Sequence, residues 1–441
     1  MSEICLNCVK DVYLREIARD ESLRITCSYC GGSGPGLELV QLAAIVEDPL
    51  QANAAHGEVV SEWDSEFDRP VDRQMGDELE WFLQEECGID ADPATDLAVI
   101  LEDRDPEDPR KGGEPFFDRE QTFCRGDVYP VDHEYSWQEF SYRIRHERRF
   151  FDDWARRQLA EILGEPGSEE AKELPILEVG PEHEIEWVWR ARRAESEEAA
   201  LQITRYPARN LGPPPPEKAV PGRMNPAGIP VFYGALSRET ALAEVRPWVG
   251  GLVVVGQFGS TRPLRLLDLT KLGDRAAGSL FQSGYGARAE RLQFLRGFHQ
   301  LIARPVQPHD ELLDYIPTQA VAEYVANVLR LDGMVYASAQ TGALSSDPTT
   351  ERFGVEDPED DAMENHNVAL TGEAALAATE TKEADSEEAT PDFGASWEFK
   401  PKAAPGVLVF RESSADLVQV TSVRYEHKHT YVHDPKEKRD F

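Results

Sequence analysis

An arginine, a tyrosine and a glutamate lie close together in one stretch of the chain, at Arg223, Tyr233 and Glu244. Arginine is a planar, permanently charged donor that suits anionic groups, and a carboxylate can stabilise developing positive charge. Residues 240–243 leave little bulk around Glu244, so its carboxylate can approach a ligand or another backbone segment closely. We interpret this set as the functional centre. The alternative is that Glu244 and Arg223 form a structural ion pair or face water.

A turn, a strand and a helix must position these side chains. The apolar run 229–233 predicts the strand, and Ser237 is typical of an N-cap for a helix over 238–246. The turn before the strand is indicated by residues with turn preferences, namely Gly222, Asn225, Pro226 and Gly228. The three polar residues therefore sit in the turn, on the strand and on the helix.

This pattern resembles the RES domain, whose signature runs from a Gly-Arg-(Trp or Met)-Asn-Pro-x-Gly turn through an apolar strand to a Thr-Ala-x-x-Glu helix. Residues 189–192 are similar to the first strand of that domain, Thr318 and Gln319 open a helix, and residues 331–338 are similar to the strand that ends in its serine. The resemblance covers roughly residues 186–425. Several independent blocks in the expected order make it more specific than a lone motif.

The resemblance implies an α+β fold like that of ADP-ribosyltransferases and an enzyme that consumes NAD, often as a toxin. It maps the three residues of the family's name to Arg190, Glu244 and Ser338, which we predict to be catalytic. Cleavage between ribose and nicotinamide develops positive charge on the sugar, and Glu244 suits that charge. Predicted substrate-binding residues are Arg223, Asn225, Tyr233 and Asn367. Tyr233 is alternatively a core residue of an apolar strand, and Ser338 an ordinary turn residue.

The sequence does not determine which group accepts the ADP-ribose after the bond to nicotinamide is broken. Water would make the protein a glycohydrolase, phosphate a phosphorylase, and a protein side chain an ADP-ribosyltransferase. A Gly-x-Gly-x-x-Gly motif at the start of a βαβ unit is not found, so NAD is expected as a substrate and not as a Rossmann-held cofactor.

Four cysteines near the start form two Cys-x-x-Cys pairs, Cys5 with Cys8 and Cys27 with Cys30. This spacing can place four thiolates in the tetrahedron that zinc prefers, and four protein ligands leave no open position, so the metal is expected to be structural. A disulfide or redox pair is the alternative. Cys87 and Cys124 are interpreted as free thiols.

Residues 41–165 are predicted to form a mainly helical domain, with a long amphipathic helix over 134–163. It resembles the HEPN-type domain that accompanies some RES domains. The Arg143 to His146 spacing departs from the ribonuclease pattern, so we do not predict ribonuclease activity. The arginines on the polar face of the helix are interpreted as a solvated face of a scaffolding or dimerising helix.

The composition of the chain restricts the classes of partner that it is expected to bind. The net charge of −36 disfavours nucleic acid and anionic membranes as general partners, without excluding a local basic site in the N-terminal half. A stretch long enough to span a membrane and a basic, apolar leader are not apparent, which predicts a cytoplasmic protein. The acidic segment 347–392 is expected to be mostly disordered, with a short strand at 366–370, and closing strands are expected at 406–410 and 417–425.

The predicted organisation is a zinc ribbon at 1–40, the helical domain at 41–165, a linker at 166–185 and a RES domain at 186–441 with an acidic insertion at about 345–395. The expected function is a toxin or defence effector that cleaves NAD and is restrained by an antitoxin, another regulatory protein or its own N-terminal half. The competing hypotheses are a non-catalytic sensor of NAD or ADP-ribose and an N-terminal half that recognises nucleic acid. A homodimer is left open.

Overall fold

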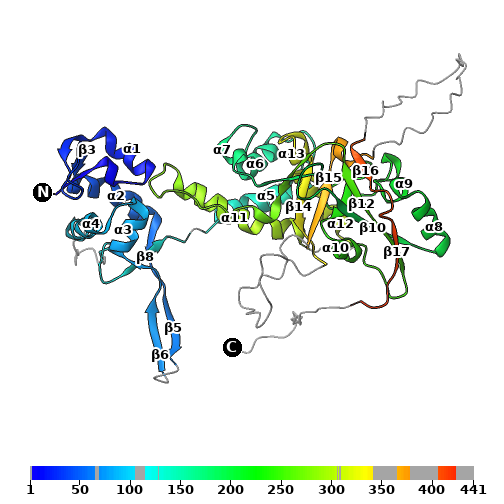
Figure 1. Cartoon of the computed structure of the whole chain (residues 1–441), viewed down its shortest axis with the longest axis horizontal. Helices are drawn as coiled ribbons and strands as arrows, with labels where there is room; N and C mark the ends of the chain where they lie inside the picture. The colour runs from blue at the N-terminus through cyan, green and yellow to red at the C-terminus, as the bar shows by residue number, and fades with distance from the viewer. Residues whose placement is uncertain are drawn as a thin grey trace, which may run out of the picture. The chain divides into compact units, whose positions relative to one another are not determined.

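The structure is a computed structural model of the 441-residue chain. It describes residues 2–64, 69–104, 115–127, 129–304, 306, 309–340, 365–377 and 406–423. The chain divides into two compact units (Figure 1), of which the first comprises Met1–Tyr135 with Gly273–Arg296 and the second Ser136–Leu272 with Gly297–Phe441. Two helices, α5 (Val131–His146) and α11 (Tyr285–Ala303), contribute residues to both units.

The first unit begins with a three-stranded antiparallel sheet of order β1-β3-β2. Its elements are β1 (Glu3–Cys5), the 3₁₀ turn η1 (Leu6–Cys8), α1 (Val12–Asp20), β2 (Leu23–Thr26) and β3 (Ser33–Glu38). The side chain of Asp11 caps α1 by accepting a hydrogen bond from the Leu14 N–H. Cys5 ends β1, Cys8 ends η1, and the β2–β3 loop carries Cys27 and Cys30.

The rest of this unit combines helices with short antiparallel strands. The helices are α2 (Leu39–Asn53), α3 (Leu79–Cys87) and α4 (Ala91–Arg104). The strands are β4 (Ala54–His56), β7 (Asp77–Glu78) and β8 (Thr122–Arg125), in the order β4-β8-β7, and the hairpin β5 (Val59–Asp64) and β6 (Arg69–Gln74). Buried apolar residues of α2 recur at helical spacing, so this helix buries one face in the core. The region that we predicted to be mainly helical therefore also contains strands.

The long helix predicted over 134–163 is interrupted. It consists of α5 and α6 (Asp153–Leu163), separated by a loop in which Phe151 has a φ of 56°. Asp152 begins α6 as its N-cap, accepting from the Trp154 N–H at 3.1 Å, and its carboxylate pairs with Arg143 at 2.7 Å. Burial acts to raise the pKa of Asp152, but the Arg143 guanidinium and backbone N–H groups hold it below its ordinary value. The cap and the ion pair explain why a new helix starts here.

The second unit is built on a curled nine-stranded sheet in an α+β arrangement. The order is β16-β12-β10-β11-β15-β14-β13-β9, with β17 also paired to β12, and β13 with β14 is its parallel pair. The strands are β9 (Ile176–Val179), β10 (Val188–Ala194), β11 (Phe232–Ala235), β12 (Leu252–Ser260), β13 (Leu264–Asp268), β14 (Gly333–Ala337), β15 (His366–Leu370), β16 (Leu408–Phe410) and β17 (Asp416–Gln419).

The second unit also contains helices, some of which pack on the sheet. They are α7 (Glu169–Lys172), α8 (Glu197–Arg205), α9 (Pro207–Leu211), α10 (Arg238–Glu244), α12 (Glu311–Asp314) and α13 (Ile316–Asn327), with 3₁₀ turns η2 (Pro216–Lys218), η3 (Leu269–Lys271) and η4 (Gly372–Ala375). Helices α8 and α9 pack on β10 and β12, whereas α13 packs on β14 (Figure 1). The core between sheet and helices includes Phe232, Phe258 and Val368, all fully buried.

Most of the predicted elements of this unit are present. The strand at 366–370 is confirmed, and β16 lies within the closing strand predicted at 406–410. β17 overlaps the closing strand predicted at 417–425, but it begins one residue earlier and ends at Gln419. The interval 166–185, predicted as a linker, contains α7 and β9, the edge strand beside β13. The predicted disorder of 347–392 concerns residues that, apart from 365–377, lie outside the described part of the chain.

Candidate functional site

The turn before β11 is organised by Asn225, which is 3% exposed. Its Nδ2 donates to the carbonyl oxygens of Val220, Pro226 and Ile229 at 2.9–3.1 Å, and the Gly222 N–H donates to the Asn225 carbonyl at 2.9 Å. Four backbone groups are thus satisfied by one residue. The predicted substrate-binding residue Asn225 stabilises the turn and does not line the cavity described below.

Tyr233 joins this turn to the sheet. Its hydroxyl donates to Asn225 Oδ1 at 2.8 Å and accepts from the Met224 N–H at 2.8 Å. A Cβ on Gly222 would lie 2.8 Å from both the Asn225 Oδ1 and the Tyr233 hydroxyl, so glycine is required by this close approach. Burial raises the pKa of Tyr233, and the hydroxyl therefore stays protonated at neutral pH.

The strand is shorter than predicted, because β11 begins at Phe232 and not at Ile229. Pro230 has no N–H to contribute to a ladder, and the Ile229 carbonyl is taken by Asn225. The following helix is confirmed, with Ser237 accepting from the Thr240 N–H as N-cap, but it ends at Glu244.

Arg223 leaves the turn toward the end of α11. Its Nη1 donates to the carbonyl oxygens of Ile302 and Arg304 at 2.6 and 2.9 Å, and its guanidinium lies 5.1 Å from the centre of the Tyr315 ring. The backbone carbonyl of Arg223 accepts from the Thr318 hydroxyl at the start of α13. Arg223 thus has carbonyl and aromatic partners but no carboxylate partner among these contacts, which leaves its charge available to an anion.

Glu244 stands at the last position of α10 and remains accessible to solvent. Its Oε1 accepts from the Ser338 hydroxyl at 2.6 Å and from Asn367 Nδ2 at 2.7 Å. Ser338 follows β14 and is fully buried, and Asn367 lies on the neighbouring strand β15. The structure therefore brings together a glutamate, a serine and an asparagine that are far apart in sequence, and it fixes one carboxylate oxygen.

Arg190 reaches the same region from β10. Its Nη1 donates to the Tyr233 carbonyl at 2.5 Å, and its guanidinium lies 4.8 Å from the centre of the Phe232 ring. Burial, and then the charge of Arg192, lower the pKa of Arg190 to about 10. Arg190 is nonetheless protonated at neutral pH and can bind an anion.

These side chains border a cavity of about 320 Å³. Of the predicted residues, Arg190, Arg223, Tyr233, Glu244 and Asn367 line it, and Ser338 lies behind Glu244. Lining residues that the sequence did not predict include Arg246, Tyr315, Tyr336 and Gln340. One carboxylate therefore faces three arginines and three tyrosines, a combination suited to a ligand with both anionic and ring-shaped parts.

Asn367 has spare hydrogen-bonding capacity in this cavity. Within the described residues, its buried Oδ1 has no hydrogen-bond partner, whereas its Nδ2 binds Glu244. A buried acceptor without a partner is costly, so a donor group of a ligand is a natural partner for it.

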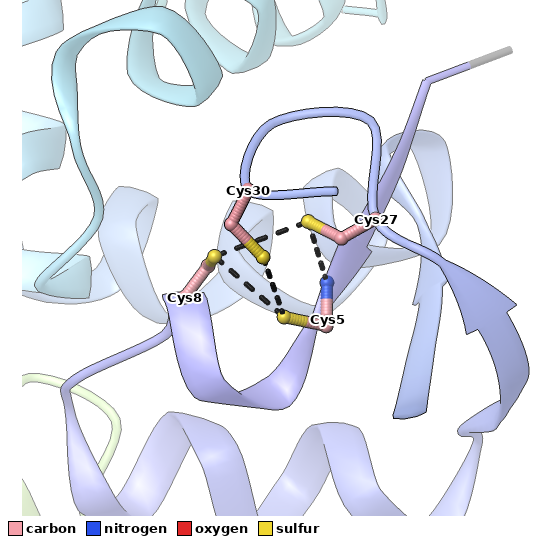
Figure 2. A group of neighbouring side chains, drawn as sticks. All are labelled: Cys5, Cys8, Cys27 and Cys30. Atoms are coloured by element: carbon pink, nitrogen blue, oxygen red, sulfur yellow. Dashed lines mark hydrogen bonds between the residues drawn. The ribbon is translucent and has the colours of Figure 1, made fainter. Parts of the chain in front are cut away.

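A second candidate site is formed by Cys5, Cys8, Cys27 and Cys30, whose sulfurs face one another (Figure 2). Cys5 Sγ lies 3.6 Å from the Sγ atoms of both Cys8 and Cys30, and Cys8 Sγ lies 3.9 Å from that of Cys27. Zinc–sulfur bonds of about 2.3 Å in a tetrahedron require sulfur separations of about 3.8 Å. The four thiols thus have the donor set and spacing of a closed metal site.

Backbone groups support these sulfurs. The Cys5 N–H donates to Cys27 Sγ and the Gly32 N–H to Cys30 Sγ, each at 3.4 Å (the first is drawn in Figure 2). Burial acts to raise the pKa of Cys27, but such backbone donors lower it to about 6. Cys87 and Cys124 are free thiols, as predicted.

Three of the six arginines predicted on the polar face of 134–163 have acidic partners. Arg143 pairs with Asp152 and lies 4.7 Å from the centre of the Trp154 ring, Arg145 pairs with Asp314 at 3.3 Å and Arg156 with Glu165 at 3.4 Å. Positive charge that is already paired offers little to phosphates. These three ion pairs reduce the positive charge that this face offers to a nucleic acid.

Comparison with protein families gives one finding for this site: residues 187–348 match the family model of the RES domain. The chain therefore contains a RES domain, as predicted. No curated protein and no solved structure matches the chain significantly. The predicted HEPN-type region and zinc ribbon lie outside the matched residues and stay predictions. Asn367 also lies beyond them, although β15 pairs with β11 and β14 in the centre of the same sheet.

Every helix within the described residues is too short or too polar to cross a membrane.

Proposed function

We propose that the RES-containing unit cleaves the bond between nicotinamide and ribose in NAD. The observation that carries the proposal is the cavity in which one anchored carboxylate, Glu244, faces three arginines and a set of tyrosines. NAD presents the complementary groups, because it has two phosphates, two sugars and two aromatic rings. The presence of a RES domain supports an activity on NAD.

Glu244 is the proposed catalytic group. Departure of nicotinamide leaves positive charge on the ribose, and a carboxylate close to the sugar stabilises it. Ser338 and Asn367 both donate to Oε1, so within the described residues Oε2 has no hydrogen-bond partner and is free to face the sugar or its 2′-hydroxyl. Fixing one oxygen in advance spares the reorganisation that a mobile side chain would require.

The arginines are the proposed phosphate ligands. Arg190 and Arg223 are held by backbone carbonyl oxygens and lie against aromatic rings, which orients each guanidinium without neutralising it. Tyr315 and Tyr336 offer ring surfaces for the nicotinamide or ribose. The Tyr233 hydroxyl is already occupied by Met224 and Asn225, so its part in the site is mainly to hold the turn.

The four cysteines are the proposed site of a structural zinc ion. The sulfur spacing supports this, and four protein ligands would leave no position for substrate. The zinc ion would stabilise the fold of β1, β2 and β3 around the cysteines.

The biological role that we propose is that of a toxin or defence effector. An NAD-cleaving enzyme would harm its own cell, so restraint by an antitoxin, another protein or the first unit is part of the proposal. The acceptor is water, phosphate or a protein side chain.

The test is incubation of the full chain with NAD, with and without inorganic phosphate, followed by mass spectrometry. Free nicotinamide would establish cleavage, and ADP-ribose, its 1-phosphate or a modified protein would identify the acceptor. NAD binding without any nicotinamide release would favour the competing hypothesis of a sensor.

A further inference from the structure

A second cavity, of about 630 Å³, adjoins the first. Ala191, Glu244, Val245 and Arg246 line both. The second cavity is also bordered by Arg192, Arg193, Glu195 and Trp248. Its charged residues are three arginines and two glutamates, an excess of positive charge in a chain whose net charge is −36. Such a local excess indicates a place for an anionic ligand.

Arg246, which borders both cavities, has an unusual backbone. Its φ is 46°, the left-handed region that a side chain with a Cβ adopts at a cost, and it lies one residue past Val245, the C-cap of α10, where glycine is the usual residue. The Arg246 N–H closes the helix on the Ala243 carbonyl at 2.9 Å. A glycine would serve this turn better, so the turn alone does not account for an arginine here.

The side chain of Arg246 has no hydrogen bond or ion pair within the described residues, in contrast with Arg190 and Arg223. Its charge nevertheless acts on the first cavity, because Arg246 and Arg223 both oppose the rise that burial causes in the pKa of Tyr315. Arg246 is thus a guanidinium at the shared wall of two cavities, without a partner of its own.

Cavities that hold a drug-sized ligand have volumes of about 300–1,000 Å³, and the first cavity is at the lower end of this range. A whole dinucleotide is larger than the first cavity. If nicotinamide and its ribose occupy the first cavity beside Glu244, the remainder must extend past the shared wall. The phosphates would then pass Arg246, and the second base would meet Trp248, over which Arg193 lies at 5.5 Å from the ring centre.

We infer that Arg246 binds the phosphates of the dinucleotide where it passes from the first cavity into the second, which holds the adenylate half. This inference rests on the proposed function, since it assumes a dinucleotide in the first cavity. Arg246 is accordingly a further substrate-binding residue, outside the predicted set.

The test replaces Arg246 by glycine and measures the affinity for ADP-ribose by calorimetry on the full chain, with nicotinamide release from NAD in parallel. Arg330 supplies a matched control, because it is an exposed arginine with a φ of 56° that borders neither cavity. Arg246→Gly and Arg330→Gly both relieve a left-handed backbone, so neither should lower the melting temperature. Arg246→Asn, which also tolerates that conformation, provides a second variant.

We expect the dissociation constant for ADP-ribose to rise about tenfold in Arg246→Gly and Arg246→Asn and to stay unchanged in Arg330→Gly. Equal affinity in all four proteins would overturn the inference, even if NAD is cleaved and the proposed function stands. A wild-type chain that binds ADP-ribose but releases no nicotinamide would contradict the proposed function, while the affinity ratio still decides on Arg246. Absence of ADP-ribose binding by the wild-type chain would also overturn the inference.

Discussion

Ser338 and Asn367 donate to the same oxygen of Glu244, and this shared acceptor is the main feature of the site at the scale of single residues. Both donors are buried, at 0% and 3% exposure, so their positions are set by the sheet and not by solvent. Within the described residues they leave Oε2 without a hydrogen bond. We expect them to act as positioning residues that orient the carboxylate before substrate arrives.

Removing the serine hydroxyl tests this role. Ser338→Ala should lower kcat about 10- to 100-fold and change KM little, because a hydrogen bond to a charged group contributes about 1.5–3 kcal/mol and each 1.4 kcal/mol is tenfold in rate. Steady-state kinetics with NAD provides the measurement. Ser260→Ala, which removes a hydroxyl at the end of β12 outside the cavity, is the control. Unchanged kcat in Ser338→Ala would show that orientation of Glu244 does not depend on the serine.

At the scale of elements, the turn at 222–228 explains why the site residues hold together. Asn225 satisfies three carbonyl groups, Tyr233 closes the turn onto β11, and Gln319 at the start of α13 donates to the carbonyls of Gly222 and Asn225 at 2.8 and 3.0 Å. The turn is thereby tied to both a strand and a helix. This hydrogen-bond network fixes the position of Arg223.

Asn225→Ala should therefore act on stability first. It would leave three backbone carbonyl groups and the Tyr233 hydroxyl without the side chain that they bind, which we expect to reduce the free energy of unfolding by about 2–4 kcal/mol. Denaturant unfolding followed by near-ultraviolet circular dichroism would measure the loss. Asn225→Asp keeps the acceptor for Tyr233 and removes the donors, so it separates the two contributions. Full stability of the alanine variant would refute the turn-stabilising role.

Local sequence signals predicted some of these elements well. The Ser237 cap, the small residues of α10 and the apolar run of β15 are signals that depend only on neighbouring residues. The sequence could therefore predict these two elements, and both are confirmed. Arg246 was missed for a physical reason: in the helix predicted to continue to residue 246 it would lie about 200° from Glu244, on the opposite face. The helix ends at Glu244, and the left-handed backbone of Arg246 turns its side chain to the same cavities.

Tyr315 and Tyr336 were missed because long-range packing, not local pattern, brings them to Glu244. Asn225 shows the opposite case. Its place in the turn that resembles the RES signature led us to predict a ligand-binding role, but its buried side chain stabilises the turn instead. The sequence also could not distinguish a linker from β9, because a four-residue edge strand carries little pattern of its own.

At the scale of the whole molecule, the two compact units carry separate sites, the cysteine cluster in the first and the Glu244 cavity in the second. The first unit has its own buried core, to which α2, α3 and α4 contribute. We propose a structural and regulatory role for it. In this proposal the second unit carries out the cleavage of NAD.

Loss of one cysteine should reveal whether the first unit depends on metal. Cys8→Ser should release one zinc ion per chain and lower the stability of this unit, because metal binding contributes directly to folding. Cys124→Ser, which removes a thiol outside the cluster, should keep the full zinc content. Elemental analysis of the purified proteins would measure both. Equal zinc content in the two variants, or none in the wild type, would contradict the assignment.

The most direct test of the central claim is nicotinamide release from NAD by the full chain and by Glu244→Gln, measured by mass spectrometry. Glutamine keeps the shape of the side chain and removes its charge, so we expect release to fall at least about 100-fold while NAD still binds. Glu239→Gln, on the first turn of the same helix and outside both cavities, should retain activity. Equal release by the wild type and Glu244→Gln would contradict the account.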